Sequence, residues 1–174
     1  RGGGRLAPRL PRRGPDGHDE RTPFERIADP GSTLIGDKRL LLSLSRQLEQ
    51  EAFAVKGEAV VLATFQDARF FTDRMRRRYE RIAASASLVG ALGVGVPPRP
   101  GVGVRGSGLS SEDRLRGEWD VVVVGPHFAG AFVARDLGDT GADAERRFEY
   151  FMTYERARVT AAAQALLQHL VADD

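Results

Sequence analysis

The 174-residue chain contains no cysteine, which excludes disulfides, zinc ribbons, iron–sulfur clusters and a thiol nucleophile. It also contains no apolar run near the ~18 residues that a membrane-spanning helix needs. The chain does not open on the charged, apolar and cleavable regions of a signal peptide. These absences predict a cytoplasmic protein without membrane insertion, and the length suits one globular domain.

The net charge is also small, because the chain contains 26 basic and 24 acidic side chains. Residues 1–13 hold five arginines and no acid, which leaves 21 basic and 24 acidic residues in the rest of the chain. A nucleic-acid-binding domain normally carries a strongly basic surface, so this balance argues against nucleic acid as a partner. A regulator that contacts nucleic acid through its basic tail remains an alternative.

The spacing of glycine and proline divides the chain in two. Residues 1–36 are too densely interrupted by these residues for a regular element, and their apolar residues are scattered. The sequence therefore predicts a disordered Arg/Gly/Pro-rich tail over residues 1–36. Regular patterning begins at Asp37, so we expect the folded domain to span residues 37–172.

Within this domain the hydrophobic pattern alternates between helical and strand-like periods. Leu41, Leu44, Leu48 and Ala52 share one helical face, whereas residues 60–65 and 119–125 read as buried strands. The predicted helices cover residues 37–55, 68–86 and 153–172, and the predicted strands cover residues 60–65, 88–94, 102–109, 119–125, 128–137 and 147–153. The order α-β-α-β-β-β-β-β-α predicts an α/β (mixed α+β) single domain with a central mixed five- to six-stranded sheet flanked by helices.

Motifs of catalysis and cofactor binding are mostly missing. Residues 101–106 match G-x-G-x-x-G, but they follow a proline-rich loop and lead into Ser107-Gly108 instead of a helix. A dinucleotide fingerprint must follow a buried strand and begin a helix, so we interpret this stretch as a turn and a strand. The sequence predicts no cofactor.

The three histidines, His18, His127 and His169, lack the spacing of metal ligands, so no metal site is predicted. Nor does the sequence show a nucleophile paired with a base and an orienting group, and we expect no catalytic residue. The alternative is an uncharacterised small enzyme that uses Glu149 or Asp136 together with His127.

A ligand site is predicted where a central strand ends and a helix begins. Gln66 and Arg69 offer directional polar groups among the aromatic side chains Phe65 and Phe70, as small-molecule sites do. This junction is the usual place for a ligand in an α/β sheet. We expect Trp119 to close the same cavity.

A second candidate is a stripe of arginines on the following helix, which could receive a phosphate or an acidic partner. The stripe consists of Arg74, Arg77, Arg78 and Arg81. The alternative interpretation is a solvated face whose side-chain stems cover the edge of the core.

Several of these segments resemble one known family. The resemblance rests on the helix from Lys38 to Arg46, on Phe65-Gln66 with Arg69-Phe70, on the run from Trp119 to Pro126, and on Arg146-Arg147-Phe148-Glu149. In order and character these segments are similar to the DICT sensory domain over residues 37–172. The resemblance implies a non-catalytic bacterial input domain found beside diguanylate cyclases and two-component signalling proteins.

The family resemblance also implies signal transduction, with a small-molecule ligand or a partner protein as input and a proposed role in light response. The implied partner is a signalling output domain or a regulator protein, in cis or in trans. The sequence shows no output domain, so the alternatives are a stand-alone sensor, a fragment, or a partner acting in trans. The resemblance assigns no binding residues.

Overall fold

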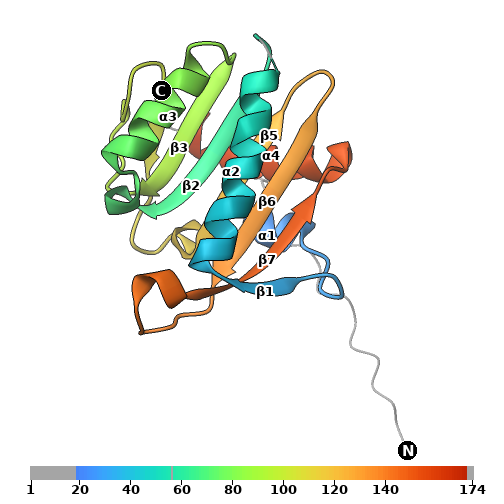
Figure 1. Cartoon of the computed structure of the whole chain (residues 1–174), viewed down its shortest axis with the longest axis vertical. Coiled ribbons are helices and arrows are strands. Elements are labelled where there is room, and N and C mark those ends of the chain that lie inside the picture. The colour runs from blue at the N-terminus through green and yellow to red at the C-terminus, as the bar shows by residue number, and fades with distance from the viewer. Residues whose placement is uncertain (1–18, 56, 172–174) are drawn as a thin grey trace, which may run out of the picture.

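One seven-stranded mixed β-sheet is built from the residues that the computed structural model describes, 19–55 and 57–171 (Figure 1). The strand order is β1-β7-β6-β5-β2-β3-β4. The strands are β1 (Leu34–Asp37), β2 (Val60–Asp67), β3 (Leu88–Val94), β4 (Arg105–Gly108), β5 (Glu118–Val124), β6 (Ala129–Asp136) and β7 (Arg147–Thr153). The predicted mixed α+β class is confirmed, and the predicted count of five to six strands is one or two too low.

Helices cover both faces of the sheet (Figure 1). The α-helices among the described residues are α1 (Pro23–Ile27), α2 (Lys38–Ala54), α3 (Asp73–Ala83) and α4 (Arg156–Val171). The shorter 3-10 turns are η1 (Ala68–Phe70), η2 (Arg114–Gly117) and η3 (Asp143–Glu145). No helix in the described part of the chain is both long and apolar enough to cross a membrane.

The topology combines a parallel crossover with an antiparallel meander. β2, α3 and β3 form the crossover, with β2 and β3 parallel, and β4 is parallel to β3. β5, β6 and β7 are successive antiparallel neighbours, and β5 pairs antiparallel with β2. β2 therefore lies in the interior of the sheet, which explains its nearly continuous apolar sequence.

Alternate residues of the same strands enter two separate cores. In β5, Val121 and Val123 pack on the side of α2 and α3, whereas Val122 packs on the side of α1 and α4. Successive side chains of a strand point to opposite faces, so a run of valines fills both cores at once. The α1/α4 face is covered by the apolar side of α4, where Val159 and Leu166 are fully buried.

The prediction of a disordered tail is wrong for residues 19–36; residues 1–18 lie outside the described part of the chain. Thr22 caps α1 by accepting the Glu25 N–H, and α1 buries Phe24 and Ile27 against α4 and the sheet. β1 then pairs antiparallel with β7 at the edge of the sheet. These contacts are long-range, so the local composition of the segment gave no sign of them.

The predicted helix over residues 68–86 is divided in the structure. Asp67 caps the 3-10 turn η1 by accepting the Arg69 N–H at 2.9 Å, and Thr72 caps α3 by accepting the Met75 N–H at 3.3 Å. Each of these two capping residues begins its own helical segment, so the chain turns between the two segments. The last helix also starts three residues later than predicted, at Arg156.

Candidate functional site

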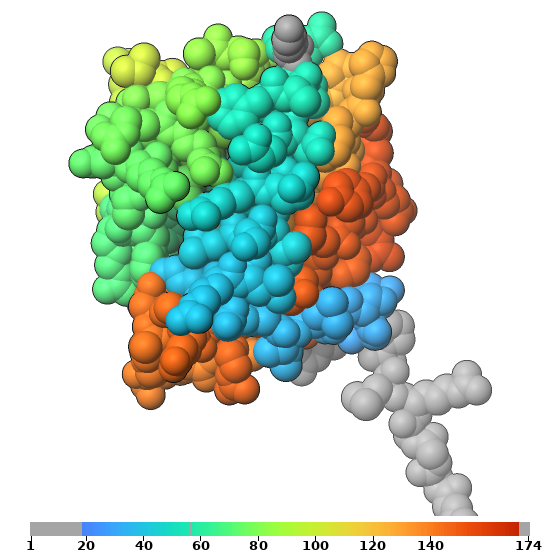
Figure 2. Space-filling view, viewed as in Figure 1, coloured from blue at the N-terminus to red at the C-terminus, as the bar shows by residue number. Residues whose placement is uncertain are grey.

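A partly open pocket of about 210 Å³ lies on the α2/α3 face of the sheet, at the carboxyl end of β2. Figure 2 views the molecule from this side, with α2 crossing its middle and α3 beside it. Helices α2 and α3 form the walls of this α2–α3 pocket, and the strands form its floor. The lining residues are Lys38, Leu42, Arg46, Phe65, Gln66, Phe70, Thr72, Arg74, Met75, Arg78, Trp119, Arg146 and Phe148.

Aromatic side chains from three strands form the floor. Phe65 comes from β2, Trp119 from β5 and Phe148 from β7. The Trp119 and Phe148 rings meet edge to face at 5.6 Å between centroids, and Trp119 also contacts the buried Phe132 ring at 6.1 Å. Edge-to-face pairs fix ring orientation, so the floor is a firm apolar surface and not a loose cluster.

Gln66 stands at one end of the pocket on a distorted piece of backbone. Its φ of 60° lies in the left-handed region, and the β2–β3 register shifts between Thr64 and Asp67. This bulge turns the Gln66 side chain toward β6 and β7. Its amide donates to Asp136 at 3.3 Å and accepts from Arg146 at 3.2 Å. Positive φ is uncommon for a residue other than glycine, and such positions cluster at functional sites.

The cations at this end are neutralised by aspartates. Arg146 pairs with Asp136 and, at 3.1 Å, with Asp143, and Lys38 also pairs with Asp143. Burial raises the pKa of Asp136, but hydrogen bonds from the Gly138 N–H and the Arg146 guanidinium outweigh burial and hold that pKa below its ordinary value. The hydrogen bond from Lys38 likewise lowers the pKa of Asp143. This neutralised end therefore carries little net charge.

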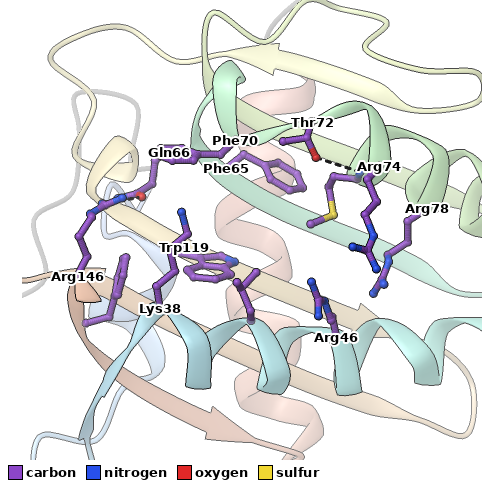
Figure 3. A pocket seen from close by; sticks show the side chains of 13 residues that line it. Lys38, Arg46, Phe65, Gln66, Phe70, Thr72, Arg74, Arg78, Trp119 and Arg146 are labelled. Carbon is purple, nitrogen blue, oxygen red and sulfur yellow. Dashed lines mark hydrogen bonds between the residues drawn. The ribbon is translucent and has the colours of Figure 1, made fainter. Parts of the chain in front are cut away.

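The opposite end holds three arginines, here called the arginine cluster: Arg46 from α2, and Arg74 and Arg78 from α3. Figure 3 shows their guanidinium groups turned toward the same space between the two helices. With the residues that the structure describes, none of the three forms a hydrogen bond or a close ion pair, and Nη1 of Arg78 is buried without a hydrogen-bond partner. An unsatisfied buried donor is costly, which makes this end receptive to an acceptor.

Glu49, one turn beyond Arg46 on α2, is an acid whose carboxyl interacts with the charges of both Arg78 and Arg46. Its side chain is only 1% exposed, and burial raises the pKa of the Glu49 carboxyl to about 7, although the charge of Arg78 and the hydrogen bond to Tyr79 oppose the shift. Near neutral pH this carboxyl is therefore charged only part of the time. It compensates the arginine cluster incompletely.

A family model matches residues 22–137 of the chain, that of DICT, described as a sensory domain in diguanylate cyclases and two-component systems. The chain belongs to the DICT family. The resemblance expected from the sequence is confirmed, although the matched range begins earlier and ends earlier than residues 37–172. No curated protein and no solved structure matches the chain.

The DICT domain brings most of the residues of the first predicted site together. Phe65, Gln66, Phe70 and Trp119 all line the α2–α3 pocket. Arg69 does not, because its guanidinium lies over the Phe70 ring at 4.8 Å while the side chain stays exposed.

The arginine stripe of the DICT domain is split by the helical turn. Arg74 and Arg78 lie four residues apart on the side facing α2 and line the pocket. Arg77 is exposed, and Arg81 lies over the Phe53 ring at 5.3 Å. Half of the stripe therefore belongs to the same pocket as the first predicted site.

Sequence reasoning missed several lining residues of the DICT domain: Lys38, Leu42, Arg46, Thr72, Met75, Arg146 and Phe148. A usable signal was present, since the family resemblance already rested on the segments from Lys38 to Arg46 and from Arg146 to Glu149. The fold places both segments beside the carboxyl end of β2.

The residues of the alternative enzyme site lie apart in the structure. Asp136 belongs to the network at the neutralised end, and Glu149 pairs with Arg135, whose guanidinium lies over Phe24 on the α1/α4 face. His127 precedes β6, nine residues from Asp136, a separation of roughly 30 Å along an extended strand. Within the described residues no group of three or more His, Asp or Glu side chains could hold a metal ion.

Proposed function

We propose that the α2–α3 pocket is the input site of this DICT sensory domain, where a small molecule binds and changes the relative stability of two arrangements of α2 and α3. One observation carries the proposal: a pocket of about 210 Å³ with an aromatic floor and polar ends opens between α2 and α3 on one face of the sheet. An apolar cavity with a few convergent polar groups is the usual form of a small-molecule site.

The pocket is too large to be a packing defect. Protein interiors are close-packed, and voids larger than a water molecule are few. Here Trp119 and Phe70 are only partly buried, which leaves apolar area that a ligand would cover. Covering it would be favourable by about 25 cal/mol per Å² before the costs of binding.

A bound molecule would touch both helices at once, because Leu42 and Arg46 belong to α2 while Met75 and Arg78 belong to α3. A ligand that prefers one spacing of these helices shifts the population toward that spacing. The output module, in cis or in trans, would recognise the altered helical surface. In a light response the domain would act after a photoreceptor and would not absorb light itself. The pocket, at about 210 Å³, is small even for a drug-sized molecule and so leaves little room for a light-absorbing group.

The test uses Trp119, the one tryptophan in the chain. Its indole N–H gives a single signal in a ¹H–¹⁵N spectrum, and 2-naphthamide is a neutral planar probe. We expect a saturable shift of that signal, together with slower amide exchange in α2 and α3.

Two variants on the same helix provide the control. Leu42→Phe enlarges a side chain inside the pocket and is expected to weaken 2-naphthamide binding by roughly tenfold. Leu40→Phe makes the same change on an exposed position outside the pocket and is expected to bind as the wild type does. Equal affinity of all three proteins, or a Trp119 signal that never saturates, would place the input site elsewhere.

A further inference from the structure

The two ends of the α2–α3 pocket differ in charge balance. At the neutralised end, Lys38 and Arg146 are paired with Asp143 and Asp136. At the other end, the arginine cluster faces the same cavity without hydrogen bonds or close ion pairs to the described residues. A ligand with one charged group would therefore be oriented by this asymmetry.

We infer that the pocket takes a small aromatic carboxylate, with its ring over the Trp119 floor and its carboxylate held by the arginine cluster of Arg46, Arg74 and Arg78. This inference rests on the proposed function, because it names the ligand class of that same site. Two features of this end favour an anion: the mutual repulsion of the guanidinium groups and a buried hydrogen-bond donor without a partner.

Repulsion comes first, because three guanidinium groups turn toward one space from two helices (Figure 3). Glu49, whose carboxyl interacts with the charges of Arg78 and Arg46, is buried, and its pKa is raised to about 7, so its charge offsets the cluster only in part. A carboxylate placed among the guanidiniums replaces like-charge repulsion with attraction, most strongly at Arg78, which is partly buried.

Hydrogen bonding supplies the second reason. Nη1 of Arg78 is a buried donor without a partner. A guanidinium presents parallel N–H donors that match the two oxygens of a carboxylate, so one ligand group satisfies a donor that the protein leaves unpaired.

The remaining lining specifies the rest of the ligand. Between the neutralised end and the arginine cluster the pocket offers Leu42, Phe65, Met75, Trp119 and Phe148. Such walls cover a flat apolar body, and they would leave the hydroxyl groups of a sugar phosphate without partners. A nucleotide with its base, sugar and phosphates would extend out of a pocket of about 210 Å³, whereas a small aromatic acid fits within it.

The closing experiment compares 2-naphthoate with 2-naphthamide, two compounds of nearly equal shape that differ in charge. Affinity is measured on the full chain from the Trp119 indole signal. We expect 2-naphthoate to bind wild type roughly tenfold or more tightly than the neutral amide, in line with a charge-assisted hydrogen bond. Arg74→Gln should remove most of that preference, and its affinity for the amide should stay unchanged.

Arg77→Gln is the matched control, since Arg77 is an exposed arginine on the same helix outside the pocket. It should keep the full preference for 2-naphthoate. Arg46→Gln repeats the test from α2, so a folding defect in one variant does not decide the outcome.

Three results would overturn the inference. Equal binding of both compounds would disprove the carboxylate class while leaving the ligand pocket intact. Inorganic phosphate that shifts the Trp119 signal more strongly than 2-naphthoate would assign the arginine cluster to phosphates. Absence of binding by either compound would overturn the proposed function as well.

Discussion

The two faces of the sheet differ in how closely the helices pack on them, although both faces are formed by residues of the same strands. On the α1/α4 face, α4 fills most of the space over the sheet, and Val159, Ala162 and Leu166 have no exposed surface. A cleft of about 460 Å³ lies beside α4 and is lined by residues of α1, β4 and η2. On the α2/α3 face, the two helices leave the pocket open above Trp119, which is only partly buried. The filled face can therefore carry the stability of the domain, while the open face keeps surface available for a ligand.

The largest expected effect comes from removing α1 from the filled face. Deleting residues 1–28 exposes the surface that Phe24 and Ile27 cover, and Glu118 loses the Phe24 N–H that it accepts at 2.9 Å. Burial of two large apolar side chains contributes about 3–6 kcal/mol, so we expect a loss of that order in the free energy of unfolding. Urea unfolding measures it.

A protein lacking only residues 1–18 is the reference for that deletion. Equal unfolding midpoints for the two deletions would mean that α1 adds nothing to the filled face. The contrast between the faces would then rest on α4 alone.

The second effect compares one leucine from each face. Leu166→Ala empties a fully buried position under α4 and should cost about 3 kcal/mol of unfolding free energy. Leu42→Ala shortens a half-buried side chain at the pocket and should cost less than about 1 kcal/mol, because the space beside it is already open. Similar losses in urea unfolding would contradict the division of roles.

The smallest effect concerns buried acids on the filled face. Burial raises the pKa of Glu118 to about 7, although hydrogen bonds with Thr22, the Phe24 N–H and Asp120 oppose that shift. Burial and the neighbouring Glu118 carboxyl raise the pKa of Asp120 well above its ordinary value. At these two carboxyls the folded state therefore binds more protons than the unfolded chain, so their charges destabilise the fold least below about pH 4.5 and increasingly as pH rises through about 7. Asp120→Asn should be more stable than wild type at pH 8, and this advantage should shrink at pH 5.

Glu49 provides the matching acid on the open face. Its raised pKa gives the same sign, but Arg78 opposes the shift, so Glu49→Gln should gain less at pH 8 than Asp120→Asn does. Wild-type stability that stays flat between pH 5 and pH 8 in urea unfolding would contradict both expectations.

Local sequence patterns were enough for most elements of the sheet. The strand at residues 147–153 and the crossover around β2 were predicted because period-two alternation and an apolar run are local signals. α1 was not, since it is a single turn whose contacts lie far away in sequence, such as the bond from Phe24 to Glu118. Stability here comes from tertiary packing, which periodicity cannot show.

The residues of the candidate site were likewise predictable only in part. Phe65 and Gln66 could be placed because strand ends beside helix starts are common ligand positions in α/β sheets. Arg146 lies in the turn before β7, and only the order of strands brings it to Gln66, 80 residues earlier in the chain. The arginine cluster depends on the spacing of α2 and α3, which the sequence does not encode locally.

The position of β7 has a practical consequence for moving this sensor between proteins. The family match ends at residue 137, yet β7 pairs with both β1 and β6 and supplies Phe148 to the pocket floor. A chimera cut at that boundary would leave β1 without its neighbouring strand and would remove Phe148 from the pocket floor. It would also lack α4. The transplantable unit therefore runs through residue 171, and fusions should be joined beyond it.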